Sequence, residues 1–213
     1  MTDEPLASGQ EADVYALDDR RVLRRYRRDT DVTAEADLMR YVGGLGYPVP
    51  EVYAAHGSDM EMERLDGPTM AQAMVTDGIA LHEAAEMLAG LLHRLHELPS
   101  LPGGERQILH LDLHPENVML TGRGPVVIDW CNARDGEADL DTGLSALIVA
   151  QVAADDSHPW SAPAGAFLDA FLPVAPGDPR RLLDDAIAVR MRQQRMDTPE
   201  PLRAAIARVR DGR

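Results

Sequence analysis

The sequence has one cysteine and no long hydrophobic run. Cys131 has no second cysteine with which to form an internal disulfide, and this favours a reducing compartment such as the cytoplasm. No apolar stretch approaches the roughly 20 residues that a membrane-spanning helix needs. The first residues, 1–5, are acidic, unlike the basic start of a secretory signal peptide. From these absences we expect a cytoplasmic protein, and its 213 residues are enough for one or two small domains with a real core.

Basic residues are also scarce relative to acidic ones. The sequence has 21 Lys and Arg residues and 36 Asp and Glu residues, which gives a formal net charge of −15. Such a surface argues against non-specific binding to nucleic acid or to anionic membranes, because both attract basic proteins. It favours a cationic substrate, although acidic surfaces also arise for solubility alone.

The most informative stretch is residues 110–120, which a turn at 121–125 separates from an apolar run at 126–130. The apolar segments on either side of the turn predict a pair of β-strands. The polar residues that interrupt these segments are His110, Asp112, Asn117 and Asp129. Carboxylates are rarely buried without partners, so packing alone does not explain this set.

The spacing of these polar residues is typical of phosphoryl transfer. Asp112 precedes Asn117 by five positions, and Asp129 ends the second apolar run. In this arrangement the first Asp orients the attacking hydroxyl and accepts its proton. The Asn oxygen and the second Asp hold Mg²⁺ against the nucleotide phosphates, and Mg²⁺ prefers such hard oxygen ligands. A loop with solvated acids is the alternative explanation.

The two motifs resemble those of the aminoglycoside phosphotransferase and choline kinase group, within the protein-kinase-like fold. The resemblance lies in HLDLHPENV at 110–118 and VVIDW at 126–130, and it extends over residues 6–150. Protein kinases usually have Arg after the His and Phe-Gly after the metal-binding Asp. This chain has Leu111 and Trp130 at those places, as small-molecule kinases often do.

The resemblance implies an α+β fold with two lobes. A small N-terminal lobe, residues 1–66, would contain an antiparallel sheet and one helix and would cover the nucleotide. A larger and mainly helical C-terminal lobe, residues 67–213, would carry the catalytic residues. At the hinge between them, backbone groups near Glu63 and Leu65 would hydrogen-bond the adenine.

The resemblance also assigns residues to the nucleotide phosphates. The hairpin expected over residues 6–17 would cover them with backbone N–H groups near Ser8 and Gly9. Only one glycine lies in this turn, so an ordinary hairpin is the alternative.

The third expected strand, residues 21–26, would carry a cation to the phosphates. The family has a lysine there, and the matching residue in this chain is Arg24. Arg25 is the competing register, because a shift of one residue reverses the face of a strand. Glu35, in a helix expected at 32–42, matches the acid that pairs with this cation, although a favourable interaction with the helix dipole also explains it.

His110 and Asp141 are expected to support the catalytic loop. Asp141 would start a helix and hydrogen-bond the loop backbone, and a plain N-terminal cap is the alternative. Residues 130–140 contain no Ser, Thr or Tyr, which argues against a protein kinase that is switched by phosphorylation. Beyond them the sequence is helical, and in related enzymes such helices shape the acceptor pocket.

We therefore expect a kinase that uses Mg²⁺ and moves the γ-phosphoryl group of ATP or GTP to a hydroxyl of a small molecule. Neither nucleic acid nor a membrane is expected as a partner. The overall charge favours a cationic acceptor such as an amino sugar, an aminoglycoside or an amino alcohol. The acids expected to border its pocket are Asp155, Asp156, Asp184 and Asp185.

Two other functions stay open. The first is a nucleotide-binding pseudokinase that acts as an interaction module, which Arg24 and the sparse glycine loop suggest. The second is a metal-dependent hydrolase, in which His110, Asp112 and His114 bind a transition metal. The hydrolase leaves Asn117 and Asp129 without a role.

Overall fold

The computed structural model describes residues 4–9, 11–76 and 78–211. The chain divides into two compact units, and each is described by itself. The first contains Met1–Gly67 and Met119–Cys131, and the second contains Pro68–Val118 and Asn132–Arg213.

The lobe ranges expected from the sequence, 1–66 and 67–213, stay a prediction, and the compact units differ from them in one respect. Residues 119–131 belong to the first unit although they follow 51 residues of the second, Pro68–Val118. A single boundary at residue 66 cannot describe a unit that is made of two separate segments of the chain.

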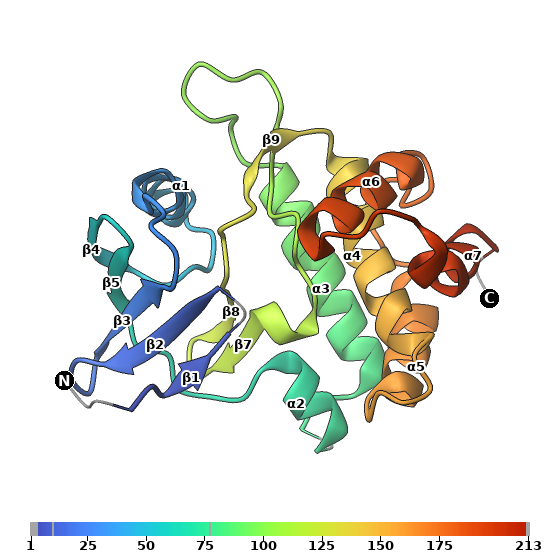
Figure 1. Ribbon diagram of the computed structural model, residues 1–213, viewed down its shortest axis with the longest axis horizontal. Helices are drawn as coiled ribbons and strands as arrows, with labels where there is room; N and C mark the ends of the chain where they lie inside the picture. The colour runs from blue at the N-terminus through green and yellow to red at the C-terminus, as the bar shows by residue number, and fades with distance from the viewer. Residues whose placement is uncertain (1–3, 10, 77, 212–213) are drawn as a thin grey trace. The chain divides into compact units, whose positions relative to one another are not determined.

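The first unit is built on a five-stranded antiparallel sheet with the strand order β1-β2-β3-β5-β4 (Figure 1). Its strands are β1 (Ala7–Ser8), β2 (Ala12–Ala16), β3 (Arg21–Tyr26), β4 (Val52–His56) and β5 (Asp59–Glu63). The strand expected at 21–26 is confirmed. Gln10, in the turn of the expected 6–17 hairpin, lies outside the described residues.

Helix α1 (Thr33–Gly44) packs beside β4 and buries Ala36, Met39 and Val42. The carboxylate of Asp31 accepts a hydrogen bond from Thr33 N at 3.0 Å, which satisfies one of the free donors at the helix start. The helix expected at 32–42 therefore begins one residue later and continues through the glycine at position 44.

A hairpin of β7 (Val118–Thr121) and β8 (Gly124–Val127) supplies the returning segment of the first unit. The sequence predicted a strand from about residue 110, and this is wrong for the residues before Val118. A loop precedes a single turn of 3₁₀ helix, η1 (Pro115–Asn117), because proline lacks the N–H that a strand ladder needs.

The second unit is mainly helical (Figure 1). Its elements are α2 (Met70–Val75), α3 (Leu81–His96), β6 (Gln107–Leu109), η1, β9 (Arg134–Gly136), α4 (Ala138–Ala153), α5 (Ser161–Phe171), α6 (Leu183–Gln194), η2 (Glu200–Leu202) and α7 (Arg203–Asp211). In the part of the chain that the structure describes, no helix combines the length and apolar character that a membrane crossing needs. The α+β composition expected from the sequence is confirmed.

Helix α4 forms the centre of this unit. It contacts α3, α5, α6 and α7, and every residue from Asp141 to Ala150 is buried. A helix that is apolar on all sides is stable only when it is covered on all sides, and four neighbours cover this one. The polar exceptions among these residues are Asp141, Thr142 and Ser145.

Strands β6 and β9 pair in antiparallel register, with Leu109 opposite Arg134 and Gln107 opposite Gly136. One strand leads directly into the loop that begins at His110, and the other leads into α4. In this register the end of β9 lies opposite the start of β6, and the first turn of α4 is connected to the loop by the carboxylate of Asp141.

Candidate functional site

The loop after β6 has a strained backbone that two helices hold in place. Leu111 adopts a φ of 61°, a left-handed conformation that costs a residue with a Cβ about 1 kcal/mol or more. Asp141 of α4 accepts hydrogen bonds from His110 N at 3.0 Å and from Leu111 N at 2.7 Å. Gln193 of α6 donates from Nε2 to Leu111 O at 2.9 Å. Both backbone polar groups of the strained residue are thus bound by side chains.

Asp141 is fully buried and charged. Burial acts to raise the pKa of its carboxyl, but His96 and the backbone donors outweigh this and hold the pKa below its usual range. His96 Nε2 lies 3.0 Å from Asp141 Oδ2. Asp141 lies within the first turn of α4 and the N-cap position belongs to Glu137, so the plain-cap explanation is wrong.

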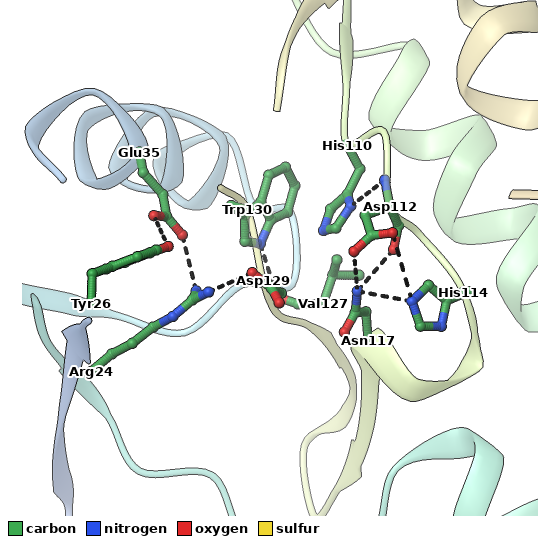
Figure 2. Close-up of polar contacts among 10 residues, drawn as sticks. All are labelled: Arg24, Tyr26, Glu35, His110, Asp112, His114, Asn117, Val127, Asp129 and Trp130. Carbon is green, nitrogen blue, oxygen red and sulfur yellow. Dashed lines mark hydrogen bonds and ion pairs between the residues drawn. The ribbon is translucent and has the colours of Figure 1, made fainter. Parts of the chain in front are cut away.

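Within the loop, several polar contacts converge on Asp112 (Figure 2). The ring nitrogen His110 Nδ1 accepts a hydrogen bond from Asp112 N at 3.2 Å. Asn117 Nδ2 donates to Asp112 O at 2.9 Å and approaches Asp112 Oδ2 at 3.3 Å. His114 Nε2 lies 3.3 Å from the same amide nitrogen. The side chain of Asp112 is 19% exposed, so a ligand can reach its carboxylate.

The orientation of the Asn117 amide matters for metal binding. Its contacts to Asp112 and His114 are made by Nδ2, and the bond to a backbone carbonyl defines which end is the nitrogen. The carbonyl Oδ1 is therefore left for a cation, and an amide oxygen is a ligand that Mg²⁺ accepts.

In the first unit, Arg24 lies between two carboxylates (Figure 2). Its Nη1 is 3.0 Å from Glu35 Oε1 and its Nη2 is 2.5 Å from Asp129 Oδ1. Tyr26 donates from its hydroxyl to Glu35 Oε2 at 2.6 Å, and its ring lies 4.8 Å from the guanidinium carbon. Burial acts against the charge, but Asp129 and Glu35 outweigh it and raise the pKa of Arg24. The cation is held rigidly in its charged form.

The structure also separates the two possible registers of β3. Arg24 is buried, whereas Arg25 is exposed and pairs with Asp59 at 2.6 Å. The inward cation is therefore Arg24, as the alternation predicted. The sequence contains no lysine at all, so an arginine is the only permanent cation that any position of this chain supplies.

Asp129 lies just beyond the end of β8, and its φ of 64° is left-handed. The next residue, Trp130, is buried, donates from Nε1 to Val127 O at 3.0 Å and packs its ring against Tyr47 edge to face. This packing fixes the turn that presents Asp129. Asn117 belongs to the second unit, so a metal shared by Asn117 and Asp129 stays a prediction.

The remaining nucleotide residues predicted from the sequence belong to the first unit. Gly9 N–H donates to Ala12 O at 2.9 Å and so forms part of the hairpin turn, while Ser8 hydrogen-bonds Asp13. Glu63 ends β5, where its carboxylate accepts from Arg123 at 2.7 Å, and Leu65 follows it. Their roles toward phosphate and adenine stay predictions.

The first unit's opening segment ends at a residue that has to be glycine. Gly67 has a φ of 140°, and a Cβ there would lie 2.0 Å from Leu120 O. Gly67 lies two positions after Leu65, at the point where the chain passes to the second unit.

Sequence reasoning missed helix α6 as part of this site. Gln193 lies 82 positions from Leu111, and no motif connects the two. It also missed His96 of α3 as a partner of Asp141. Only the fold brings these side chains to the loop.

The metal-dependent hydrolase is not supported. Among residues 4–9, 11–76 and 78–211, no three His, Cys, Asp or Glu side chains are grouped to hold a metal ion. His110 uses Nδ1 for the loop backbone, and His114 Nε2 lies 3.8 Å from Asp112 Oδ1. The alternation expected of a strand is absent, because these residues form a loop.

Solved structures show the same fold at low sequence identity. APH(2'')-IIa in a ternary complex with streptomycin and ATP matches with a TM-score of 0.63 and 15% identity, over 94% of this chain and 90% of that chain. Aminoglycoside phosphotransferase APH(3'')-Id from Streptomyces rimosus matches with a TM-score of 0.59 and 17% identity, over 93% and 92%. Amicoumacin kinase hAmiN, in complex with AMP-PNP, Ca²⁺ and Ami, matches with a TM-score of 0.52 and 14% identity, over 98% and 88%. These likenesses establish the protein-kinase-like fold.

At the level of sequence, no curated protein matches the chain. The profile of the phosphotransferase enzyme family, however, matches it over two overlapping segments, residues 2–104 and 69–183. These segments include the loop around Asp112, β3, α1 and the first turn of α4. The chain therefore belongs to the phosphotransferase enzyme family.

Proposed function

We propose that this protein transfers the γ-phosphoryl group of ATP or GTP to a hydroxyl of a small molecule. The observation that carries the proposal is the loop around Asp112. Asp141 and Gln193 hold its strained backbone, His110 and Asn117 fix Asp112, and the Asp112 carboxylate stays accessible. A protein that needed this loop only for folding would have no use for an accessible carboxylate on a strained backbone.

In the proposed reaction, Asp112 orients the acceptor hydroxyl and accepts its proton. The acceptor oxygen forms a bond to the γ-phosphorus while the bond from that phosphorus to the bridging oxygen breaks, and the nucleoside diphosphate leaves with the electron pair. Positioning and charge neutralisation supply most of the catalysis, because the transition state is loose.

Asn117 and Asp129 have the donor atoms that suit Mg²⁺, an amide oxygen and a carboxylate. Bound there, Mg²⁺ would neutralise charge on the β- and γ-phosphates. Arg24, held by Glu35, would supply the cation that a lysine supplies in much of the family. A guanidinium binds two oxygens at once, so it can keep Glu35 and still reach a phosphate oxygen.

The charge of the acceptor needs a separate argument. A cationic amino sugar or amino alcohol was expected partly from acids in the C-terminal region. Asp155 accepts a hydrogen bond from Ser157, and the exposed Asp184 lies 3.3 Å from Arg210, so two of the four acids have local partners. The groups around Asp112 are therefore a better guide to the acceptor.

The experiment is a screen of hydroxylated amines, sugars, acids and antibiotics for acceptor-stimulated release of ADP or GDP. Asp112→Asn should abolish transfer and leave nucleotide affinity nearly unchanged, because the residue acts on the acceptor. The matched control is Glu116→Gln, an exposed carboxylate in the same loop, which should behave as the parent. Full turnover by Asp112→Asn would remove Asp112 from the mechanism. Nucleotide binding without any transfer would favour the pseudokinase.

A further inference from the structure

Helix α6 brings a second polar side chain to the catalytic loop. Arg190 Nη1 lies 3.7 Å from Asp112 Oδ1, and the two side chains are 17% and 19% exposed. Arg190 Nε donates to Gln151 Oε1 of α4 at 3.0 Å, which orients the guanidinium. Arg190 and Gln193 lie one turn apart on α6, so the helix contributes both residues to the same loop.

The protein compensates the charge of Arg190 incompletely. A guanidinium has five N–H donors, and within the described residues only the Nε donor is in a hydrogen bond. The contact to Asp112 is an ion pair too long for a hydrogen bond. Burial lowers the pKa of Arg190, and Asp112 opposes this only in part. A half-buried cation with free donors is costly unless something binds it.

Gln193, one turn further along α6, has a buried acceptor atom without a hydrogen bond to any described residue. Its Nε2 is used by Leu111 O, while its Oε1 is buried and accepts no hydrogen bond from the part of the chain that the structure describes. Buried acceptors without partners are rare in folded proteins and point to a missing ligand or water. Helix α6 thus carries donors on Arg190 beside Asp112 and a buried acceptor on Gln193 beside Leu111.

We propose that Arg190 binds an anionic group of the acceptor, a carboxylate or a phosphate, next to the hydroxyl that Asp112 orients. This inference rests on the proposed phosphotransferase function and names its substrate class. Hydrogen bonds need about 2.8 Å each, so the 3.7 Å between Arg190 and Asp112 fits an anion and a hydroxyl a few bonds apart. An α- or β-hydroxy acid and a hydroxyl-bearing phosphate ester have this spacing.

The test uses four compounds that share a three-carbon skeleton: glycerate, glycerol phosphate, glycerol and aminopropanediol. Each is measured twice with the full-length protein, as acceptor in nucleoside diphosphate release and as ligand in calorimetric titration of the nucleotide-bound protein. We expect the wild type to prefer glycerate or glycerol phosphate over glycerol and aminopropanediol in both measurements. Preference for one of the two anions identifies the carboxylate or the phosphate as the group that Arg190 binds.

The decisive variant is Arg190→Gln, and its control is Arg192→Gln, an exposed arginine on the same helix. Loss of a charge-assisted contact should weaken binding of the preferred anion about ten- to a hundredfold. Binding of glycerol should change far less, and Arg190→Lys should restore part of the loss. Arg192→Gln should leave all four affinities unchanged. Thermal unfolding of each variant shows whether it is folded.

Three outcomes would overturn the inference. The first is a wild type that binds neither anion. The second is a wild type that prefers the cationic or the neutral compound. The third is an equal loss for glycerol and for the anions in Arg190→Gln, which would mean that Arg190 only offsets the charge of Asp112. None of these disproves the phosphotransferase, which fails only if Mg²⁺-nucleotide binding or all acceptor-stimulated turnover is absent.

Discussion

Arg24 Nη2 lies 2.5 Å from Asp129 Oδ1, so the cation of β3 is bound to the carboxylate that is proposed to hold the metal. The same guanidinium holds Glu35 through Nη1 at 3.0 Å. A metal ion that binds Asp129 would compete with this ion pair and would leave Nη2 free for a phosphate oxygen. If the metal binds there, Glu35 would stay as the carboxylate partner of Arg24.

We expect Arg24→Met to weaken Mg²⁺-nucleotide binding and turnover by about ten- to a hundredfold, the loss of one charge-assisted contact. It should also destabilise the fold by roughly 3 kcal/mol, because Glu35 would be left buried without its cation. Nucleotide titration and denaturant unfolding measure the two effects. Arg24→Lys should keep much of the activity.

The control for this prediction is Arg25→Met. Arg25 is exposed and bound to Asp59 at the surface, where an ion pair contributes little. The Arg25→Met variant should therefore bind nucleotide as the parent does. If Arg25→Met were crippled and Arg24→Met normal, the assignment of the phosphate cation would be wrong.

Asp129→Asn should remove the metal dependence of nucleotide binding. The amide keeps the shape of the carboxylate but loses the charge that attracts Mg²⁺. The measurement is nucleotide affinity with and without Mg²⁺, and the ratio should fall toward one. Asp135→Asn, an exposed acid in the same connection, is the comparison and should keep the ratio of the parent. A parental ratio in Asp129→Asn would show that the metal is held elsewhere.

The sequence predicted well what neighbouring residues determine. The alternation of β3 put Arg24 and Arg25 on opposite faces, because strand geometry has a period of two, and the structure shows that Arg24 is the buried one. The motif at 110–120 identified the polar residues of the loop. It did not reveal that the loop is no strand, since the left-handed Leu111 depends on Asp141 and Gln193 for its hydrogen bonds.

Contacts between distant segments were the part that the sequence did not predict. Asp141 was expected to start a helix, whereas α4 begins earlier, at Ala138, where β9 ends opposite β6. Asp141 accepts hydrogen bonds from the His110 and Leu111 N–H groups, about 30 positions earlier in the chain, and no local pattern indicates this contact. Arg190 and Gln193 follow no motif, and only the packing of α6 against α4 brings them to the loop.

Asp141→Asn should change how stability depends on acidity. The folded-state pKa of Asp141 lies below the value of about 3.9 for an unfolded chain. The charged carboxyl therefore contributes stability above about pH 4, which is lost as the pH falls through the folded-state pKa. The variant lacks this contribution, so its free energy of unfolding should be lower near neutrality and should fall less steeply below about pH 4.

Urea unfolding at a series of pH values measures this difference. Asp156→Asn, at an exposed position, should follow the curve of the parent. Parallel curves for Asp141→Asn and the parent would mean that His96 and the loop amides do not stabilise the charged carboxyl. The same variant should also lose transfer activity, because an amide presents only one acceptor oxygen to the His110 and Leu111 N–H groups.

Gln193→Leu should slow transfer without affecting nucleotide affinity. The substitution keeps the approximate size of the side chain but leaves Leu111 O without its side-chain donor. An unsatisfied acceptor next to a strained residue costs about 1–3 kcal/mol, and the loop can relieve it only by moving Leu111 and, with it, Asp112. We expect kcat to fall about tenfold or more.

Hydrogen exchange at the Leu111 amide should become faster in Gln193→Leu, since the Asp141 bond depends on the same backbone conformation. Arg192→Leu on the same helix serves as the comparison and should alter neither quantity. An unchanged exchange rate with a lower kcat would assign the effect to the acceptor rather than to the loop, whereas unchanged values of both would remove Gln193 from the site.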